Sequence, residues 1–465
     1  MKKPNIIHLG GENTVTGSCH LLQADGLNIM VDCGLAQGND VLLPMESWPV
    51  RASEIDYLFL THAHIDHIGR VPELIERGFS GEIISSHATK ALLIPMLQDA
   101  MGFTDWSKKK IDQLLHTIDD LSWGFEYREK FQLKQGIKFK LGCAGHILGS
   151  CFIRFELPDG FTIVFSGDLG AKDTPILCDP DISEPCDLLI MESTYGDRNH
   201  EGRKERVRRL GEILARALKD GGKVFIPAFS LGRTQELIYE MDRLFSDPQI
   251  TQISADYGKE LAAKRRKSRK IRERKVQKAE VKIPVFIDSP LGLEITKIYS
   301  RLSEYWDKEA RELKGKGDHP IDFKGLYAVE RFWDHKKLLE MDGQAIIIAG
   351  SGMCTGGRIV DHLKSGIEDA RNDILFVGYQ AKGTAGRDIL KYSKRAGGYV
   401  VLDGERFDIR AKVHQLTGYS AHADQRGLLE WVGSMPERPG RIKLVHGENR
   451  AQEAMRIALD ESLRN

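Results

Sequence analysis

Four side chains that bind metals well fall within six consecutive positions of this chain, in the run THAHIDH at residues 61–67. The run follows the apolar segment YLFL, which predicts a buried strand. In extended backbone, residues two apart share a face, so His62 and His64 can hold one metal ion. A turn after the strand would direct Asp66 and His67 to a second ion. The spacing therefore predicts a site for two metals.

The other candidate ligands also stand at the ends of predicted strands. Asp32 ends NIMVD, His146 follows KFKLGCAG, Asp168 ends TIVFSGD and His446 ends RIKLVH. Strand ends assemble a site at one edge of an α/β sheet. Imidazoles and carboxylates without thiolates favour Zn²⁺ in an open catalytic setting, with Mn²⁺ as the alternative. Asp168 is expected to bridge the two ions, whereas Asp32 either binds metal or, as we favour, orients a ligand histidine.

Two patterns of secondary structure must position these residues. The first part has short strands with turns at Asp25-Gly26 and 158–160, which predict hairpins and a mostly antiparallel sheet. From about residue 201, helices alternate with apolar strands, which predicts a parallel, doubly wound sheet. Short strands and candidate ligands return after about residue 400. We therefore predict a first domain formed by residues 1–200 and 401–465, interrupted by an inserted domain at 201–400.

The overall composition excludes several classes of protein. Lys plus Arg and Asp plus Glu both number 67, so the net charge says nothing about a nucleic-acid partner, and any basic surface has to be local. Seven scattered cysteines without Cys-x-x-Cys spacing argue against a disulfide framework or a thiolate zinc site. No apolar run is long enough for a signal peptide or a membrane span. The sequence predicts a cytoplasmic protein with no membrane partner.

The motifs together resemble the metallo-β-lactamase superfamily, and specifically its nucleic-acid-processing β-CASP branch. THAHIDH, VDCG, GHILGS and FSGD match the superfamily. The branch is identified by ESTYG, GYSAHAD and VHGE, and by PAFSLGRTQEL, SGMCTGGR and GYQAKGTAGR in the inserted region. These motifs span nearly the whole chain. The resemblance implies an αββα metallo-β-lactamase core with an inserted β-CASP domain.

The resemblance also implies roles for two further residues. Glu192 is similar to the family's acidic motif and His422 to a second motif. Both are expected to be catalytic, together with the ligand Asp66. Without the resemblance, an equally good interpretation is that His422 merely caps a turn and Glu192 merely braces a loop. A metal-bridging hydroxide would attack phosphorus, and His422, held by Glu192, would protonate the departing oxygen.

Histidine at position 446 resembles the RNA-acting members of the branch, so single-stranded RNA is the expected substrate. Because the family often forms dimers, a homodimer is one expected assembly. Three alternatives stay open: a DNA nuclease, a hydrolase of another branch such as a thioesterase, and an inactive RNA-binding scaffold. The inserted domain and SAHAD argue against a thioesterase, and the complete ligand set argues against an inactive protein.

Strand-to-helix junctions in the inserted region predict phosphate contacts, because such junctions present backbone N–H groups to anions. The predicted contacts are Ser351, Gly352, Arg358, Ser230 and Arg233. The alternative is that these Gly-rich junctions are ordinary turns. His362 is expected to pack or hydrogen-bond on its helix, or to contact RNA. The basic run at 259–282 fits a solvated segment or a phosphate-binding one equally well.

Overall fold

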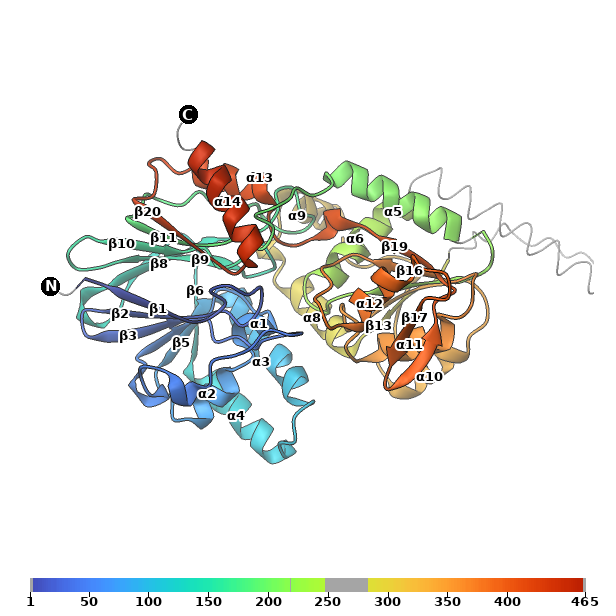
Figure 1. Ribbon diagram of the computed structural model, residues 1–465, viewed down its shortest axis with the longest axis horizontal. Coiled ribbons are helices and arrows are strands. Elements are labelled where there is room, and N and C mark those ends of the chain that lie inside the picture. Colours follow the sequence, from blue (N-terminus) through green and yellow to red (C-terminus); the bar gives the residue numbers. More distant parts are fainter. Residues whose placement is uncertain (1–2, 218, 247–282, 463–465) are drawn as a thin grey trace, which may run out of the picture. The chain divides into compact units, whose positions relative to one another are not determined.

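The computed structural model describes residues 3–217, 219–246 and 283–462 (Figure 1). The basic run at 259–282 therefore lies outside the described residues. The described residues form two compact units. One comprises those within 1–200, 297–311 and 420–465, and the other those within 201–296 and 312–419.

The first unit contains two six-stranded sheets (Figure 1). The first sheet has the strand order β1-β2-β3-β4-β5-β6, with bounds β1 Asn5–Gly10, β2 Cys19–Ala24, β3 Leu27–Val31, β4 Tyr57–Phe59, β5 Glu82–Ser86 and β6 Ser122–Phe125. The second has the order β20-β11-β10-β9-β8-β7, with bounds β7 Lys130–Gln132, β8 Lys138–Cys143, β9 Cys151–Glu156, β10 Thr162–Phe165, β11 Leu188–Glu192 and β20 Arg441–Val445.

Both predicted hairpins are present. Strands β2 and β3 pair antiparallel around Asp25-Gly26, and β9 and β10 pair antiparallel around 158–160. The prediction of a mostly antiparallel sheet holds only in part, because both sheets are mixed. Strands β3 to β6 pair in parallel, and so do β10, β11 and β20. Helices connect several of these strands, and such crossovers allow parallel pairing where a short turn does not.

The core of the first unit lies between its two sheets. It joins apolar residues of β2 to β5 with those of β8 to β11 and β20. Phe59 of β4 packs edge to face against Phe139 and Phe155 of the second sheet, with ring centroids 5.0 and 4.9 Å apart. Strands buried on both faces explain the continuous apolar runs of the sequence. This packing holds the ends of both sheets together.

Helices cover the outer faces of the two sheets. Figure 1 shows α2, α3 and α4 beside the first sheet and α13 and α14 beside the second. Trp431 of α13 and Met455 of α14 pack with Phe152 of β9. The helices of this layer are α1 Ile65–Ile68, α2 Val71–Glu76, α3 His87–Met101, α4 Lys108–Leu121, α13 Gln425–Gly433 and α14 Asn449–Ser462.

The second unit is built on a parallel sheet, as the alternation of helices and strands predicts. Its strand order is β14-β13-β15-β12-β16-β19, with bounds β12 Lys223–Pro227, β13 Val285–Asp288, β14 Leu326–Ala328, β15 Ala345–Ala349, β16 Asp373–Phe376 and β19 Lys412–Gln415. A separate antiparallel pair is formed by β17 Tyr399–Leu402 and β18 Glu405–Asp408.

The remaining helices among the described residues are α5 Arg203–Ala217, α6 Arg233–Ser246, α8 Pro290–Arg301, α9 Lys308–Gly315, α10 Phe332–Glu340, α11 Arg358–Gly366 and α12 Ala385–Tyr392. Short 3₁₀ turns occur at Met45–Ser47, Ala52–Glu54, Lys134–Gly136, Ser303–Tyr305 and Thr417–Tyr419. All seven cysteines are free thiols. Within the described ranges, no helix has the length and apolarity needed to cross a membrane.

Candidate metal centre

The candidate ligands come from strand ends of both sheets in the first unit. His62 and His64 lie shortly after β4, while His146, Asp168 and His446 follow β8, β10 and β20. His64 is partly exposed and the other four are buried. The structure brings all five together, and with them the two ligands predicted on the following turn.

Close backbone packing fixes that turn, which carries Asp66 and His67 on α1. A Cβ added to Gly34 would lie 1.6 Å from the Asp66 carbonyl oxygen, so only glycine allows this approach. The Ser18 N–H donates to the Asp66 carbonyl (2.9 Å), and the Cys33 N–H donates to the His67 carbonyl (2.7 Å). The close approach of the two backbone segments therefore requires the glycine of the VDCG motif.

The first group of ligand atoms belongs to His62, His64, His146 and Asp168. His64 Nδ1 lies 3.1 Å from Nε2 of both His62 and His146. Asp168 Oδ2 lies 3.5 Å from each of the same two Nε2 atoms. Three ring nitrogens and one carboxylate oxygen thus surround a single point.

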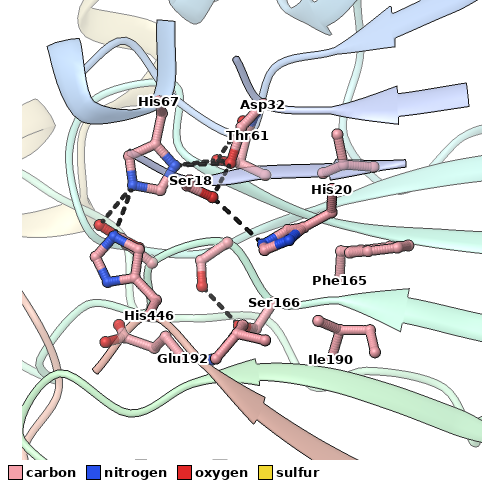
Figure 2. A pocket seen from close by; sticks show the side chains of 14 residues that line it. Ser18, His20, Asp32, Thr61, His67, Phe165, Ser166, Ile190, Glu192 and His446 are labelled. Atoms are coloured by element: carbon pink, nitrogen blue, oxygen red, sulfur yellow. Dashed lines mark hydrogen bonds and ion pairs between the residues drawn. The ribbon is translucent and has the colours of Figure 1, made fainter. Parts of the chain in front are cut away.

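The second group belongs to Asp66, His67 and His446. The Nε2 atoms of His67 and His446 are 3.1 Å apart, and Figure 2 shows the two rings facing each other. Asp66 Oδ2 lies 3.8 and 3.7 Å from these nitrogens. Asp168 joins this group as well, with Oδ2 3.3 Å from His67 Nε2 and Oδ1 3.5 Å from His446 Nε2.

The chemistry and spacing of these atoms fit two divalent cations. Ligands about 2.0–2.1 Å from a tetrahedral zinc ion lie about 3.3–3.4 Å from one another. The nitrogens and oxygens of both groups have separations near that value. Asp168 Oδ1 is buried and has no hydrogen-bond partner among the described residues. Because a buried carboxylate oxygen needs a partner, a shared cation is the simplest one for it.

Polar side chains behind the ligands orient the histidine rings. Asp32 Oδ2 lies 2.7 Å from His67 Nδ1, so Asp32 contacts the far side of that ring and belongs to neither ligand group (Figure 2). Thr61 donates to the Asp32 carboxylate from its backbone and its hydroxyl. Thr194 Oγ1 lies 3.0 Å from His446 Nδ1. The sequence reasoning missed both threonines, although each lies within a motif it used, THAHIDH and ESTYG.

Substituting Asp32 should therefore weaken one metal position and spare the other. In Asp32→Asn, the second group should lose about 10- to 100-fold in zinc affinity, because His67 loses the carboxylate that fixes its orientation. Competition with a chromophoric chelator measures both affinities. Asp25→Asn, in the β2–β3 turn, is the matched control and should bind zinc like the unaltered protein. Equal weakening of both positions would contradict this assignment.

Burial and nearby charges set the protonation of the ligand histidines. Burial holds the pKa of His62 and His146 well below the usual value and lowers that of His64 to about 4. These rings are neutral and offer a lone pair. Burial would also lower the pKa of His67 and His446, but nearby carboxylates, Asp168 foremost, raise both. Cations bound there would replace these protons.

His422 and Glu192 lie together beside the shared ligand Asp168. His422 Nδ1 is 3.2 Å from each Glu192 carboxylate oxygen and 3.7 Å from Asp168 Oδ2. Although burial opposes it, Glu192 and then Asp168 raise the pKa of His422 to about 9. An isolated β-bridge between Gly170 and His422 fixes the loop, and Leu169 N–H donates to Glu192 (2.6 Å). The pair can hold a proton next to the metal-binding groups.

In the second unit, the predicted phosphate contacts lie on two loops after parallel strands. Ser351 follows β15, and its Oγ accepts from the Thr355 N–H at 3.0 Å. Ser230 follows β12, and its Oγ lies 3.0 Å from Ser289 Oγ. Gly352, next to Ser351, is buried. Both loops stand at the carboxyl ends of the strands, where ligands of parallel sheets bind.

The two predicted arginine contacts have carboxylate partners within the fold. Arg358 Nη1 donates to Asp288 Oδ1 at 2.7 Å. Arg233 is buried and pairs with Glu236. His362 is buried, with Nε2 2.6 Å from Asp288 Oδ2, in keeping with the hydrogen-bonding alternative for this residue. The sequence did not reveal these partners, because Asp288 lies far from Arg358 and His362 along the chain.

Comparison with known families defines the class of protein. The profile described as the metallo-beta-lactamase superfamily matches residues 13–218, and the one described as the Beta-Casp domain matches residues 269–389. A third, described as the Zn-dependent metallo-hydrolase RNA specificity domain, matches residues 406–463. The chain is thus a zinc-dependent metallo-hydrolase with an RNA specificity domain.

Several proteins are similar to this chain over nearly its whole length. Ribonuclease TTHA0252 of Thermus thermophilus is 35% identical over 95% of this chain and 93% of its own length. Transcription termination factor FttA of Methanosarcina mazei is 30% identical over 96% of this chain and 67% of its own length. Cleavage and polyadenylation specificity factor 73 of Drosophila melanogaster is 28% identical over 97% of this chain and 61% of its own.

The chain belongs to the β-CASP branch of the metallo-β-lactamase superfamily, as its motifs predict. Its architecture is the metallo-β-lactamase fold with an inserted β-CASP domain. A crystal structure of a protein of unknown function from Enterococcus faecalis has the same fold, with a TM-score of 0.53 and 12% identity, covering 96% of this chain and 94% of that one.

Proposed function

We propose that this chain is a two-zinc ribonuclease that hydrolyses phosphodiester bonds in single-stranded RNA. The observation that carries the proposal is the pair of ligand groups that share Asp168, with His422 and Glu192 beside them. The similarity over nearly the whole chain to a protein named as a ribonuclease supports the choice of RNA.

Each ion would have four ligands from this chain. His62, His64, His146 and Asp168 would hold the first, and Asp66, His67, His446 and Asp168 the second. Zn²⁺ suits this set of imidazoles and carboxylates, and Mn²⁺ is the other candidate. When bound, such a pair of ions supplies an activated hydroxide and stabilises charge on the phosphoryl oxygens.

The chain's own residues would position and protonate the reacting groups. Asp168 would link the two metal positions, because its carboxylate lies 3.5 Å from His62 Nε2 of the first group and 3.5 Å from His446 Nε2 of the second. His422 would give its proton to the departing oxygen of the cleaved bond. Glu192 would keep the ring protonated and oriented through its contact with Nδ1. The donor to the leaving group would then be His422 Nε2.

Substrate contacts are proposed at the strand ends of the second unit. Ser351, Gly352 and Ser230 lie on loops where hydroxyl and backbone N–H groups can bind phosphate. Arg358 and Arg233 would act indirectly, since each guanidinium is paired with a carboxylate and holds its loop in place. A homodimer is proposed as the assembly, and light scattering of the purified protein measures it.

Cleavage of matched substrates tests the proposed function. Zinc-loaded protein should cut single-stranded RNA, and cut DNA of the same sequence far more slowly. The ladder of products separates internal cleavage from removal of nucleotides at an end. Activity on DNA or a thioester with inert RNA would contradict the proposed substrate, and inactivity on all three would indicate a binding scaffold.

Removing the metals should also destabilise the first unit. Ions that bind only the folded chain add about 4 kcal/mol per site when their free concentration is about a thousand times Kd. EDTA should therefore lower Tm by on the order of 10 °C, and added zinc should restore it. Calorimetry of the unaltered protein and of Asp168→Ala tests this expectation, because EDTA should lower Tm much less in the variant, which binds fewer ions. The same shift in both would show that chelation acts elsewhere.

A further inference from the structure

Two tyrosines on the second unit, the half-buried Tyr392 and the exposed Tyr399, stack on each other. Tyr392 ends helix α12 and Tyr399 begins strand β17 (Figure 1). Their ring centroids are 6.4 Å apart and their planes differ by 8°. Strand β17 alternates, with Val400 and Leu402 buried and Tyr399 and Val401 on the outer face, 45% and 52% exposed. Aromatic rings on an outer face do not contribute fully to the core.

Cations lie over the faces of both rings. Lys391 Nζ and the Arg395 guanidinium lie 5.0 and 5.2 Å from the centroid of the Tyr392 ring. The Arg406 guanidinium lies 4.1 Å from the centroid of the Tyr399 ring. Three cation–π contacts on two adjacent rings exceed the ordinary density of such contacts in folded proteins.

The same segment has a local excess of positive charge. Residues 382–412 contain eight Lys or Arg and four Asp or Glu, whereas the whole chain is balanced at 67 of each. Arg387 and Lys391 are four residues apart on α12 and share one face, which Lys394 and Arg395 continue. These four cations form no ion pair within the described part of the chain, and all four are exposed.

We infer that this surface, made of Arg387, Lys391, Tyr392, Lys394, Arg395, Tyr399 and Arg406, binds single-stranded RNA. The choice of RNA rests on the proposed function. Exposed lysines and arginines bind backbone phosphates, and bases stack on tyrosine rings and on guanidinium planes alike. Arg406 also pairs with Asp408 at 3.4 Å, so the four cations on and after α12 are the main phosphate partners. None of these residues belongs to the metal centre. The surface would therefore hold a part of the RNA that is not being cut.

An anionic protein or lipid surface would also attract the positive charge, but it would not need the stacked rings. The aromatic part of the surface is narrow, since the outward positions of β17 are only Tyr399 and Val401. A surface that combines cations with flat rings offers partners to both the phosphates and the bases of a single strand. Charge and stacking together therefore favour RNA.

Binding without cleavage tests the inference. Fluorescence anisotropy with a labelled oligouridylate of about 30 nucleotides, in EDTA, measures affinity for RNA that is not being cut. Arg387→Glu with Lys391→Glu should weaken binding about tenfold or more, and should reduce the salt slope by about 0.7 for each lost phosphate contact. Tyr399→Ala should weaken it about 5- to 100-fold.

A second pair of exposed cations, both of them lysines, provides the matched control. Lys336→Glu with Lys337→Glu, on α10 of the same unit, changes the net charge equally and should leave affinity within about twofold. Equal weakening by both double variants would reduce the effect to net charge and overturn the inference. Circular dichroism checks the folding of each variant. If Tyr399→Ala does not fold, the charge variants on the exposed helix face still show whether this surface binds RNA.

Failure of this inference differs from failure of the proposed function. If the zinc-loaded protein cuts RNA but the Arg387/Lys391 variant binds as tightly as the unaltered chain, the surface is not an RNA site. If the protein binds RNA through this surface but never cuts it, the proposed activity fails and the surface stands. If the Arg387/Lys391 variant loses binding to phosphatidylserine vesicles but keeps its affinity for RNA, the surface binds lipid and the inference is overturned.

Discussion

Replacing Asp168 with asparagine should abolish RNA cleavage and lower the zinc content. Both oxygens of Asp168 face ligand nitrogens, at 3.5 Å from His62 Nε2 on one side and 3.5 Å from His446 Nε2 on the other. An amide offers one weaker oxygen ligand and no negative charge. Because a pair of ions contributes several kcal/mol to the transition state, cleavage should fall by about a thousandfold or more.

Two measurements on the same sample check this expectation. Elemental analysis should show zinc falling from two ions per chain to one or none, and a gel assay should show the loss of cleavage. Asp159→Asn changes an exposed carboxylate in the β9–β10 turn and should leave both unchanged. A variant at Asp168 that keeps two zinc ions and full activity would show that the two groups do not share this carboxylate.

Replacing His422 with alanine should slow cleavage while leaving both metals bound. A proton donor in the transition state contributes about 10²- to 10⁴-fold. His422 contacts Glu192 and lies near Asp168. Its ring belongs neither to the ligand group of His62 nor to that of His446. The effect should therefore be on kcat, with zinc content near two per chain.

The leaving group distinguishes this role from a structural one. Bis(p-nitrophenyl) phosphate releases an anion that needs no proton, so its hydrolysis should fall much less than that of RNA. Glu192→Gln should show the same pattern in weaker form. His116→Ala, on an exposed part of α4, is the control and should cleave both substrates normally. Equal losses on both substrates, or loss of zinc, would mean that His422 only supports the loop.

Local patterns in the sequence predicted much of the fold. Gly26 and Gly160 mark the tight turns of two hairpins, both of which are confirmed. Alternating helices and strands predicted the parallel sheet of the second unit, also confirmed. The sheets of the first unit were predicted less well. Their parallel pairs join strands distant in sequence, such as Glu192 of β11 with Val445 of β20, and no local pattern reports such pairing.

The candidate site was predictable where ligands follow strands. His62 and Asp168 could be identified because each is a metal-binding residue type just after an apolar strand, and strand ends meet at one edge of an α/β sheet. The partners of other residues could not be found this way. The sequence around Arg358 predicted a phosphate contact, but its guanidinium donates a hydrogen bond to Asp288, 70 residues earlier in the chain. A hydrogen bond between residues so far apart becomes visible only when the sheet is assembled.

The most direct test of the two-metal account is to cut RNA in water enriched in ¹⁸O and analyse the product ends. Attack by hydroxide should place ¹⁸O in the terminal phosphate, with no 2′,3′-cyclic phosphate, and the reaction should stop in EDTA and in Asp168→Asn. A cyclic phosphate product, or cleavage that continues in that variant, would contradict hydrolysis at this metal centre.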